Sequence, residues 1–168
     1  MMDAVTEQER PEVAMGRAKE TPLYPEPTDY EDDVHAWLLE QAELLRQRRF
    51  DEVDLPNVIE ELESMGSEIR HALGSSYRLL IAHLLKWQVQ PQLRSASWEI
   101  TIGRERANID QRESRNPSLK ANARTIVADV YRHAVKEASI ETGLPRTAFP
   151  PECPWSVDPL RDEDYLPE

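Results

Sequence analysis

Apolar residues recur at helical spacing from Leu55 to Gln90 without losing phase, and this stretch constrains the fold more than any other. The residues that share the apolar side are Leu55, Val58, Ile59, Leu62, Gly66, Ile69, Leu73, Tyr77, Leu80, Leu84 and Trp87. Steps of three and four residues place side chains on one side of an α-helix. Asp54 is a suitable N-cap, and Pro91 disfavours helical geometry at the residue before it. We therefore predict one long amphipathic helix, buried along this side and continuous through Gly66 and Gly74.

Another helix is expected before the central one. It should begin near Thr28 or Asp29, because Thr28 and Glu31 have the spacing of a capping box. It should end near Arg49, since basic residues suit the C-terminal end of a helix. Its buried side is predicted from the apolar spacing to hold Val34, Trp37, Leu38, Ala42 and Leu45.

The second half of the chain carries two more helical patterns and a proline-rich end. A serine can cap a helix over about 95–114, and an Asn-Pro pair starts another helix at Pro117 that Gly143 ends. Residues 144–168 should lie on these helices as a strap. Its docking side chains are expected to be Phe149, Trp155, Leu160, Tyr165 and Leu166. Because no run shows strand alternation, the predicted fold is all-α, an antiparallel bundle of about four helices around one long central helix.

Length and composition indicate one domain. The chain has 168 residues, of which 39% are hydrophobic, and this suffices for a single core. Residues 1–28 are polar and rich in proline, so we expect a disordered tail that is dispensable for folding, followed by a domain over 29–168. The single cysteine excludes an internal disulfide, and no apolar run reaches the roughly 18 residues of a membrane helix. With no pattern of a signal peptide at the N-terminus, a cytoplasmic location is expected.

The charge of the chain is acidic but uneven. The formal net charge is −12, which opposes binding of the whole molecule to nucleic acid or to anionic membranes. Residues 30–66 hold 11 acidic and 3 basic residues, whereas residues 67–143 hold 8 acidic and 12 basic residues. Packing of acidic helices beside basic ones explains this distribution, and nucleic-acid binding through the basic 94–136 region is an alternative.

Several separated blocks of residues occur in a characteristic order. They are Tyr30-Glu31-Asp32-Asp33 with Trp37, Glu60-Glu61-Leu62-Glu63-Ser64-Met65-Gly66, His83-Leu84-Leu85-Lys86-Trp87, Gln90-Pro91, Ser97-Trp98 and Phe149-Pro150-Pro151-Glu152-Cys153-Pro154-Trp155. Through these blocks, residues 30–168 resemble the bacterial family catalogued as domain of unknown function twenty-nine. The resemblance implies a small helical cytoplasmic domain, and it implies neither an activity nor catalytic residues.

No metal site or cofactor is predicted. Glu68 and His71 form a Glu-x-x-His pair, the spacing that di-iron bundles use, but a second such pair is absent from the sequence. On a helix of about 100° per residue, His71 also lies about 180° from the apolar side, where it would face solvent. A solvated helix face is therefore the interpretation of this pair.

No catalytic residue is predicted either. On an unbroken helix Glu61 and His83 lie about 33 Å apart, too far to share a reacting atom. Cys153 stands between Glu152 and Pro154, and the sequence places no base or helix N-terminus beside it to lower the pKa of its thiol. We expect a packed thiol.

One polar edge of the central helix is a candidate ligand site. His83, Lys86 and Gln90 share a flank beside the apolar side, and Arg94 follows in the next segment. His133 occupies a similar flank on the last long helix. These five side chains could hold an anion or a carbonyl, while packing at the boundary of the core is the simpler interpretation.

The predicted function is that of a protein-interaction or self-association module, with a protein partner or a second copy as the ligand. The central helix is longer than a compact domain of this size needs, and an overhanging apolar face is normally covered. A small-ligand or enzymatic domain that uses the polar edge is the alternative from another class. The absence of a glycine-rich phosphate loop or a catalytic triad pattern favours the interaction module.

Overall fold

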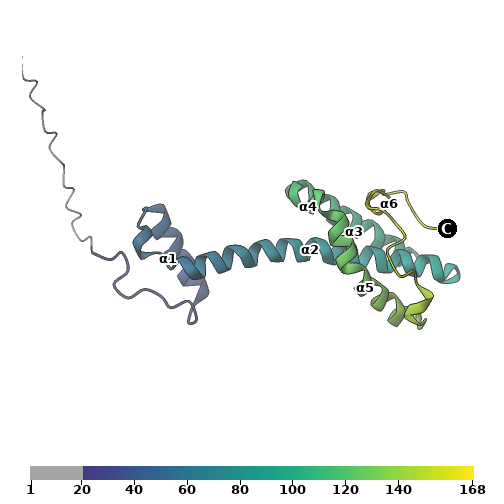
Figure 1. The fold of residues 1–168 in the computed structure, drawn as a ribbon, viewed down its shortest axis with the longest axis horizontal. Helices are drawn as coiled ribbons and strands as arrows, with labels where there is room; N and C mark the ends of the chain where they lie inside the picture. The colour runs from purple at the N-terminus through teal and green to yellow at the C-terminus, as the bar shows by residue number, and fades with distance from the viewer. Residues whose placement is uncertain (1–20) are drawn as a thin grey trace, which may run out of the picture. The chain divides into compact units, whose positions relative to one another are not determined.

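The computed structural model describes residues 21–168, which are helical with turns and contain no strand (Figure 1). The α-helices are α1 (Val34–Arg46), α2 (Leu55–Val89), α3 (Ala96–Arg115), α4 (Pro117–Ala121), α5 (Ala123–Thr142) and α6 (Val157–Arg161). Short 3₁₀ turns are η1 (Phe50–Glu52), η2 (Pro91–Leu93) and η3 (Arg146–Ala148). The predicted all-α fold with one long central helix is confirmed. None of the helices in this part of the chain is both long and apolar enough to cross a membrane.

Contacts divide the described part of the chain into two compact units, one that ends at Glu60 and one over residues 61–168. The predicted boundary at residue 29 stays a prediction, and most of the predicted tail, residues 1–20, lies outside the described residues. Residues 21–28 bind to the rest of the first unit, because the Thr21 carbonyl accepts a hydrogen bond from Arg49 and the Leu23 amide donates to Glu52.

The helix α1 starts later than the capping pattern predicts. Its N-cap is Asp33, whose Oδ1 accepts a hydrogen bond of 3.0 Å from the Ala36 amide. The expected capping box of Thr28 and Glu31 is wrong. Instead, the amide and hydroxyl of Thr28 donate to the Glu40 carboxylate at 2.9 and 2.7 Å. Aspartate is as favourable an N-cap as threonine. The capping pattern at Thr28 therefore did not exclude a helix that starts later, after Asp33.

The buried side of α1 is also shifted from the predicted one. Trp37 is buried as predicted, and the other buried residues are Gln41 and Leu44. The remaining predicted residues, Val34, Leu38, Ala42 and Leu45, are exposed. Each pair of adjacent leucines in this helix (Leu38-Leu39 and Leu44-Leu45) allows either member to face the core, so the spacing fits two buried sides. The observed side includes Gln41, whose Oε1 accepts a 2.8 Å hydrogen bond from the Asp54 amide.

The central helix α2 is continuous through both glycines, as predicted, and ends at Val89. The close packing of α5 against α2 explains why a glycine stands at position 74. A Cβ atom built on it would lie 3.2 Å from Val130 Cγ1 and 3.7 Å from Ile126 Cγ2, so glycine allows α5 to approach the backbone of α2 closely.

The core of the second unit covers only the later part of the apolar side of α2. From Leu73 onward the predicted residues Leu73, Tyr77, Leu80, Leu84 and Trp87 are buried. The earlier residues Leu55, Ile59, Leu62 and Ile69 are exposed, so their predicted burial is wrong. The partners that bury the later residues come from α3, α5 and the strap, and Figure 1 shows α3, α5 and α6 gathered beside the second half of α2.

The helix predicted between Pro117 and Gly143 is divided in two. Both ends are as predicted, and Gly143 has the left-handed conformation (φ 71°) that favours glycine after a helix. The division lies at Asn122, where the backbone leaves helical geometry and the side-chain amide donates to the Ser118 carbonyl at 2.8 Å. Asparagine competes in this way with the backbone for helical hydrogen bonds.

Residues 144–168 form the predicted strap. Its side chains Phe149, Trp155 and Leu160 are buried, Tyr165 is half-buried, and Leu166 is exposed. The buried guanidinium of Arg106 holds the end of the strap. It donates to the backbone carbonyls of Leu160 (3.3 Å), Glu163 (3.0 Å), Tyr165 (2.6 Å) and Pro159 (3.5 Å).

A buried polar network joins α2, α3 and α6. Tyr77 donates from its hydroxyl to Glu113 Oε1 at 2.7 Å, and Arg161 Nη2 donates to the same oxygen at 2.9 Å. Burial, and then the Glu113 carboxylate, raise the pKa of Tyr77 far above its ordinary value. The network therefore keeps the tyrosine neutral and fixes α6 on the bundle.

Candidate functional site

The predicted polar edge lies in the second unit, where Lys86 is buried rather than open to a ligand. Its ammonium group forms an ion pair with Glu141 and lies 4.9 Å from the centre of the Trp98 ring. His83 is half-buried, and its Nδ1 lies 2.9 Å from the Leu79 carbonyl oxygen. Burial lowers the pKa of His83, the Leu79 carbonyl opposes that shift, and the charge of Lys86 adds to it.

Gln90 and Arg94 bind backbone carbonyls near helix ends. Gln90 Nε2 donates to the Thr142 carbonyl at 3.2 Å. Arg94 Nε donates to the Trp87 carbonyl at 3.0 Å, and its guanidinium lies 5.0 Å from the centre of the Trp87 ring. These contacts satisfy carbonyl groups that have no partner within their own helices. The geometry therefore gives Lys86, Gln90 and Arg94 structural contacts inside the second unit.

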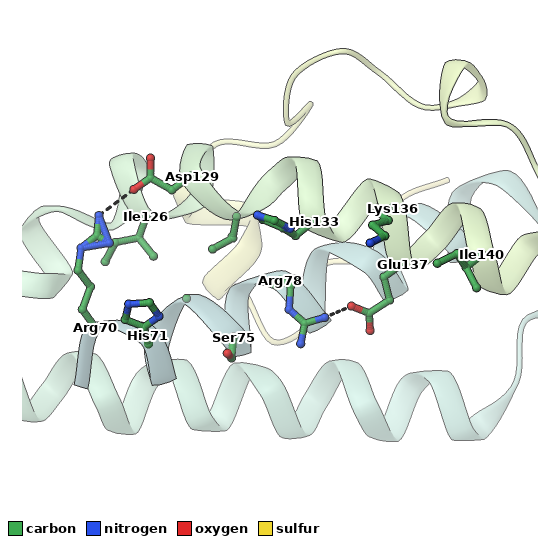
Figure 2. A pocket seen from close by; sticks show the side chains of 12 residues that line it. Arg70, His71, Ser75, Arg78, Ile126, Asp129, His133, Lys136, Glu137 and Ile140 are labelled. Carbon is green, nitrogen blue, oxygen red and sulfur yellow. Dashed lines mark hydrogen bonds and ion pairs between the residues drawn. The ribbon is translucent and has the colours of Figure 1, made fainter. Parts of the chain in front are cut away.

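The fifth predicted side chain, His133, lies elsewhere, in a groove of about 660 Å³ between α2 and α5. Figure 2 shows this groove from close by. It is lined by Arg70, His71, Gly74, Ser75, Arg78, Ile126, Asp129, Val130, His133, Lys136, Glu137 and Ile140. His83, Lys86, Gln90 and Arg94 do not line it, so the structure does not gather the five predicted residues into one site.

Two ion pairs cross this groove from α2 to α5. Arg70 Nη2 lies 2.8 Å from Asp129 Oδ2, and Arg78 pairs with Glu137 (Figure 2). Lys136 is exposed and has no ion-pair or hydrogen-bond partner among the described residues. With three bases and two acids in its lining, the groove is locally cationic on a chain of net charge −12.

His71, which is predicted to lie on a solvated helix face, is exposed and lies at this groove. Figure 2 shows His71 and His133 on the facing helices α2 and α5. The signal that could have joined them is the spacing of opposite charges, because Arg70 and Arg78 match Asp129 and Glu137 when α2 and α5 run parallel. Between residues 21 and 168, no group of three or more His, Cys, Asp or Glu side chains could hold a metal ion.

Cys153 lies in a second groove, of about 820 Å³, between α5 and the strap. The thiol is half-buried, and burial raises its pKa, while a hydrogen bond with the backbone of Trp155 acts in the other direction. A raised pKa keeps the thiol protonated and weakly nucleophilic at neutral pH. The geometry agrees with the packed thiol that the sequence predicts.

The apolar surface of α2 is the feature that sequence reasoning placed in the core. Three of its large side chains in the second unit are exposed: Leu62 by 58%, Met65 by 53% and Ile69 by 41%. Gly66 lies among them, and a Cβ atom built on it would meet nothing within 4 Å. We call these four residues the exposed α2 face. It continues, in phase, the side that is buried from Leu73 onward.

Comparison with protein families matches most of the chain. The family model described as "Domain of unknown function DUF29" matches residues 30–166. Neither the curated proteins nor the solved structures contain a match to the chain.

Proposed function

The chain belongs to the family of domain of unknown function DUF29, and from its geometry we propose that it is a protein-interaction module. The exposed α2 face is the docking surface in this proposal. A protein partner covers Leu62, Met65 and Ile69 as the chain's own helices cover the residues that follow them on α2.

The observation that carries the proposal is the change from exposed to buried along one unbroken apolar side. A solvent-facing helix surface ordinarily carries polar residues, because exposing the apolar side chain of a leucine or isoleucine to water is unfavourable in free energy. Here the apolar spacing persists before Leu73, where no helix of the second unit covers it. Single exposed apolar residues are common, but a row in phase with a core supports a surface that is buried in a complex.

The size of the effect fits a specific but modest interaction. Full burial of a leucine, isoleucine or methionine side chain contributes about 1.5–3 kcal/mol. Since the three side chains are about half exposed in the free chain, covering them would contribute roughly 2–4 kcal/mol before entropic costs. Further contacts must therefore add to the affinity, as they do when an amphipathic helix is the ligand of an apolar surface.

The proposal can be tested with a photo-crosslinking amino acid at position 62 in the full chain. The matched control carries it at Ser64, which lies about 160° around α2 from Leu62. We expect a cross-linked protein at position 62 and none at 64. That protein, once purified, should bind the wild-type chain and lose at least tenfold in affinity for the variant Leu62→Ser/Ile69→Ser. Equal cross-linking at both positions, or unchanged binding of the purified protein, would refute the proposal.

The groove between α2 and α5 supports a second candidate function, the binding of a small anion. Its positive charge excess is the specific observation, and Ser75, His133 and Lys136 are the polar groups that could contact the anion. A thermal-shift panel of phosphates and carboxylates tests it. A stabilising anion should lose its effect in Lys136→Met and keep it in Lys120→Met, which removes the same charge from an exposed site outside the groove. An equal loss in both variants would reject the groove.

Two other predictions remain proposals. Nucleic-acid binding through residues 94–136 has less support, since several of the basic residues there have partners within the chain. Arg106 binds strap carbonyls, Arg104 pairs with Glu105, and Arg112 Nε lies 3.5 Å from the Ser76 hydroxyl. Fluorescence anisotropy with a labelled duplex would test it. The cytoplasmic location likewise stays a prediction.

A further inference from the structure

The edges of the exposed α2 face are acidic. Glu61 and Glu63 are the chain neighbours of Leu62, so they lie about 100° to either side of it on the helix. Glu68 precedes Ile69 and lies on the same edge as Glu61. Both edges of the apolar face therefore carry carboxylates.

Glu63 and Glu68 are not neutralised by the basic residue that lies beside this face. Arg70 follows Ile69 and lies on the edge of Glu63, but its guanidinium is paired with Asp129 on α5 at 2.8 Å. Glu63 and Glu68 are exposed, and neither has an ion pair in residues 21–168. The face thus presents apolar side chains between two acidic edges, on a chain whose net charge is −12.

Charges beside an apolar helix seam select the partner more than they set the affinity. In paired helices, opposite charges at the edges attract, and like charges exclude the wrong partner. A second copy would bring a second set of glutamates against these edges. A helix with lysine or arginine at its edges would meet opposite charge on both sides and would be steered toward the face before contact.

We propose that the partner of the exposed α2 face is an amphipathic helix of another protein with basic residues at both edges of its apolar stripe. This inference rests on the proposed interaction function and narrows it. The apolar residues supply the contact, and Glu63 and Glu68 select the charge of the partner.

Two synthetic helical peptides can test the inference on the full chain. They carry identical leucines at steps of three and four residues, and they differ only in having lysines or glutamates at the edges. Fluorescence anisotropy should give the lysine peptide at least a tenfold lower Kd than the glutamate peptide at low salt. This ratio should shrink in 0.5 M salt, because exposed charges are screened.

Charge-reversal variants separate the acidic edges from the acidity of the whole chain. Glu63→Lys/Glu68→Lys should reverse the preference between the peptides. The control Glu99→Lys/Asp110→Lys makes the same change in net charge at exposed positions of α3 and should retain the wild-type preference. If the control reversed the preference as well, net charge rather than the edges would select the peptide, and the inference would be overturned.

Failure of the inference is distinguishable from failure of the proposed function. Equal affinities for both peptides, both lost in Leu62→Ser/Ile69→Ser, would leave the docking surface in place and overturn the charge preference. No binding of either peptide to the wild-type chain would overturn the docking surface too. A wild-type dimer in light scattering that the same double variant converts to a monomer would identify a second copy as the occupant and overturn the inference.

Discussion

Arg106 gives the sharpest prediction about what holds the second unit together. Its guanidinium is buried and donates to four backbone carbonyls of the strap, three of them at 3.3 Å or less. Burial lowers the pKa of this guanidinium, and the acidic residues that follow α6 act in the opposite direction. One guanidinium thus donates the hydrogen bonds that these four strap carbonyls accept, and it has no ion-pair partner among the described residues.

The perturbation is Arg106→Met, which keeps an unbranched side chain and removes all the donors. A hydrogen bond from a charged group contributes about 1.5–3 kcal/mol, so three good ones set an upper bound of about 9 kcal/mol. The strap lies at the surface, however, and water can replace the guanidinium once the strap loosens. We expect a loss of about 3 kcal/mol in the free energy of unfolding, or roughly 6–12 °C in Tm for a chain of this size.

Urea unfolding followed by circular dichroism measures the loss, and hydrogen exchange locates it. The amides of residues 157–167 should lose protection first. Arg106→Lys keeps the charge but has fewer donors and no planar fork, so it should recover about half of the stability. The control Arg115→Met, at an exposed position of the same helix, should change stability by less than about 0.5 kcal/mol. Equal unfolding midpoints for the two methionine variants, or strap amides that stay protected, would refute the reasoning.

Three further predictions concern stability. Trp87→Ala should lower the free energy of unfolding by about 3–5 kcal/mol. Lys86→Ala should lower it by about 1–2 kcal/mol, because the carboxylate of its partner Glu141 is partly hydrated. Equal midpoints of the two variants in denaturant titration would contradict the packing described. Because burial lowers the pKa of His83 in the folded chain, the unfolded state binds more protons, and stability should fall as the pH is lowered through the ordinary histidine pKa of about 6.5; this slope should flatten in His83→Gln. Deleting residues 1–20 should leave Tm unchanged. Deleting residues 1–28 should leave a folded chain whose Tm is a few degrees lower, because the hydrogen bonds from Thr28 to Glu40 are lost. If circular dichroism showed the second product to be unfolded, the domain boundary would have to move.

Local chemistry made the helix positions predictable. The central helix, its continuity and the helix that follows it after Ser95 agree with the apolar spacing and with start and stop residues that act within a few positions. Gly143 ends α5 as predicted, because a left-handed residue after a helix is a local requirement. The candidate site also had a local clue, since helical spacing places His83 and Lys86 on one flank and the charge of Lys86 contributes to the lowered pKa of His83.

Tertiary structure decided which of those residues meet another part of the chain. Apolar spacing shows which side of α2 can be buried, but it does not show where along α2 the helices α3 and α5 pack. Leu62 and Leu80 therefore have the same spacing in the sequence, although Leu62 is exposed and Leu80 is buried in the fold. The same limit applies to charge. Spacing gave Lys86 a polar flank, but Glu141, which forms an ion pair with it, comes from α5. Burial and pairing depend on residues far away in the chain, and helical periodicity describes only one helix at a time.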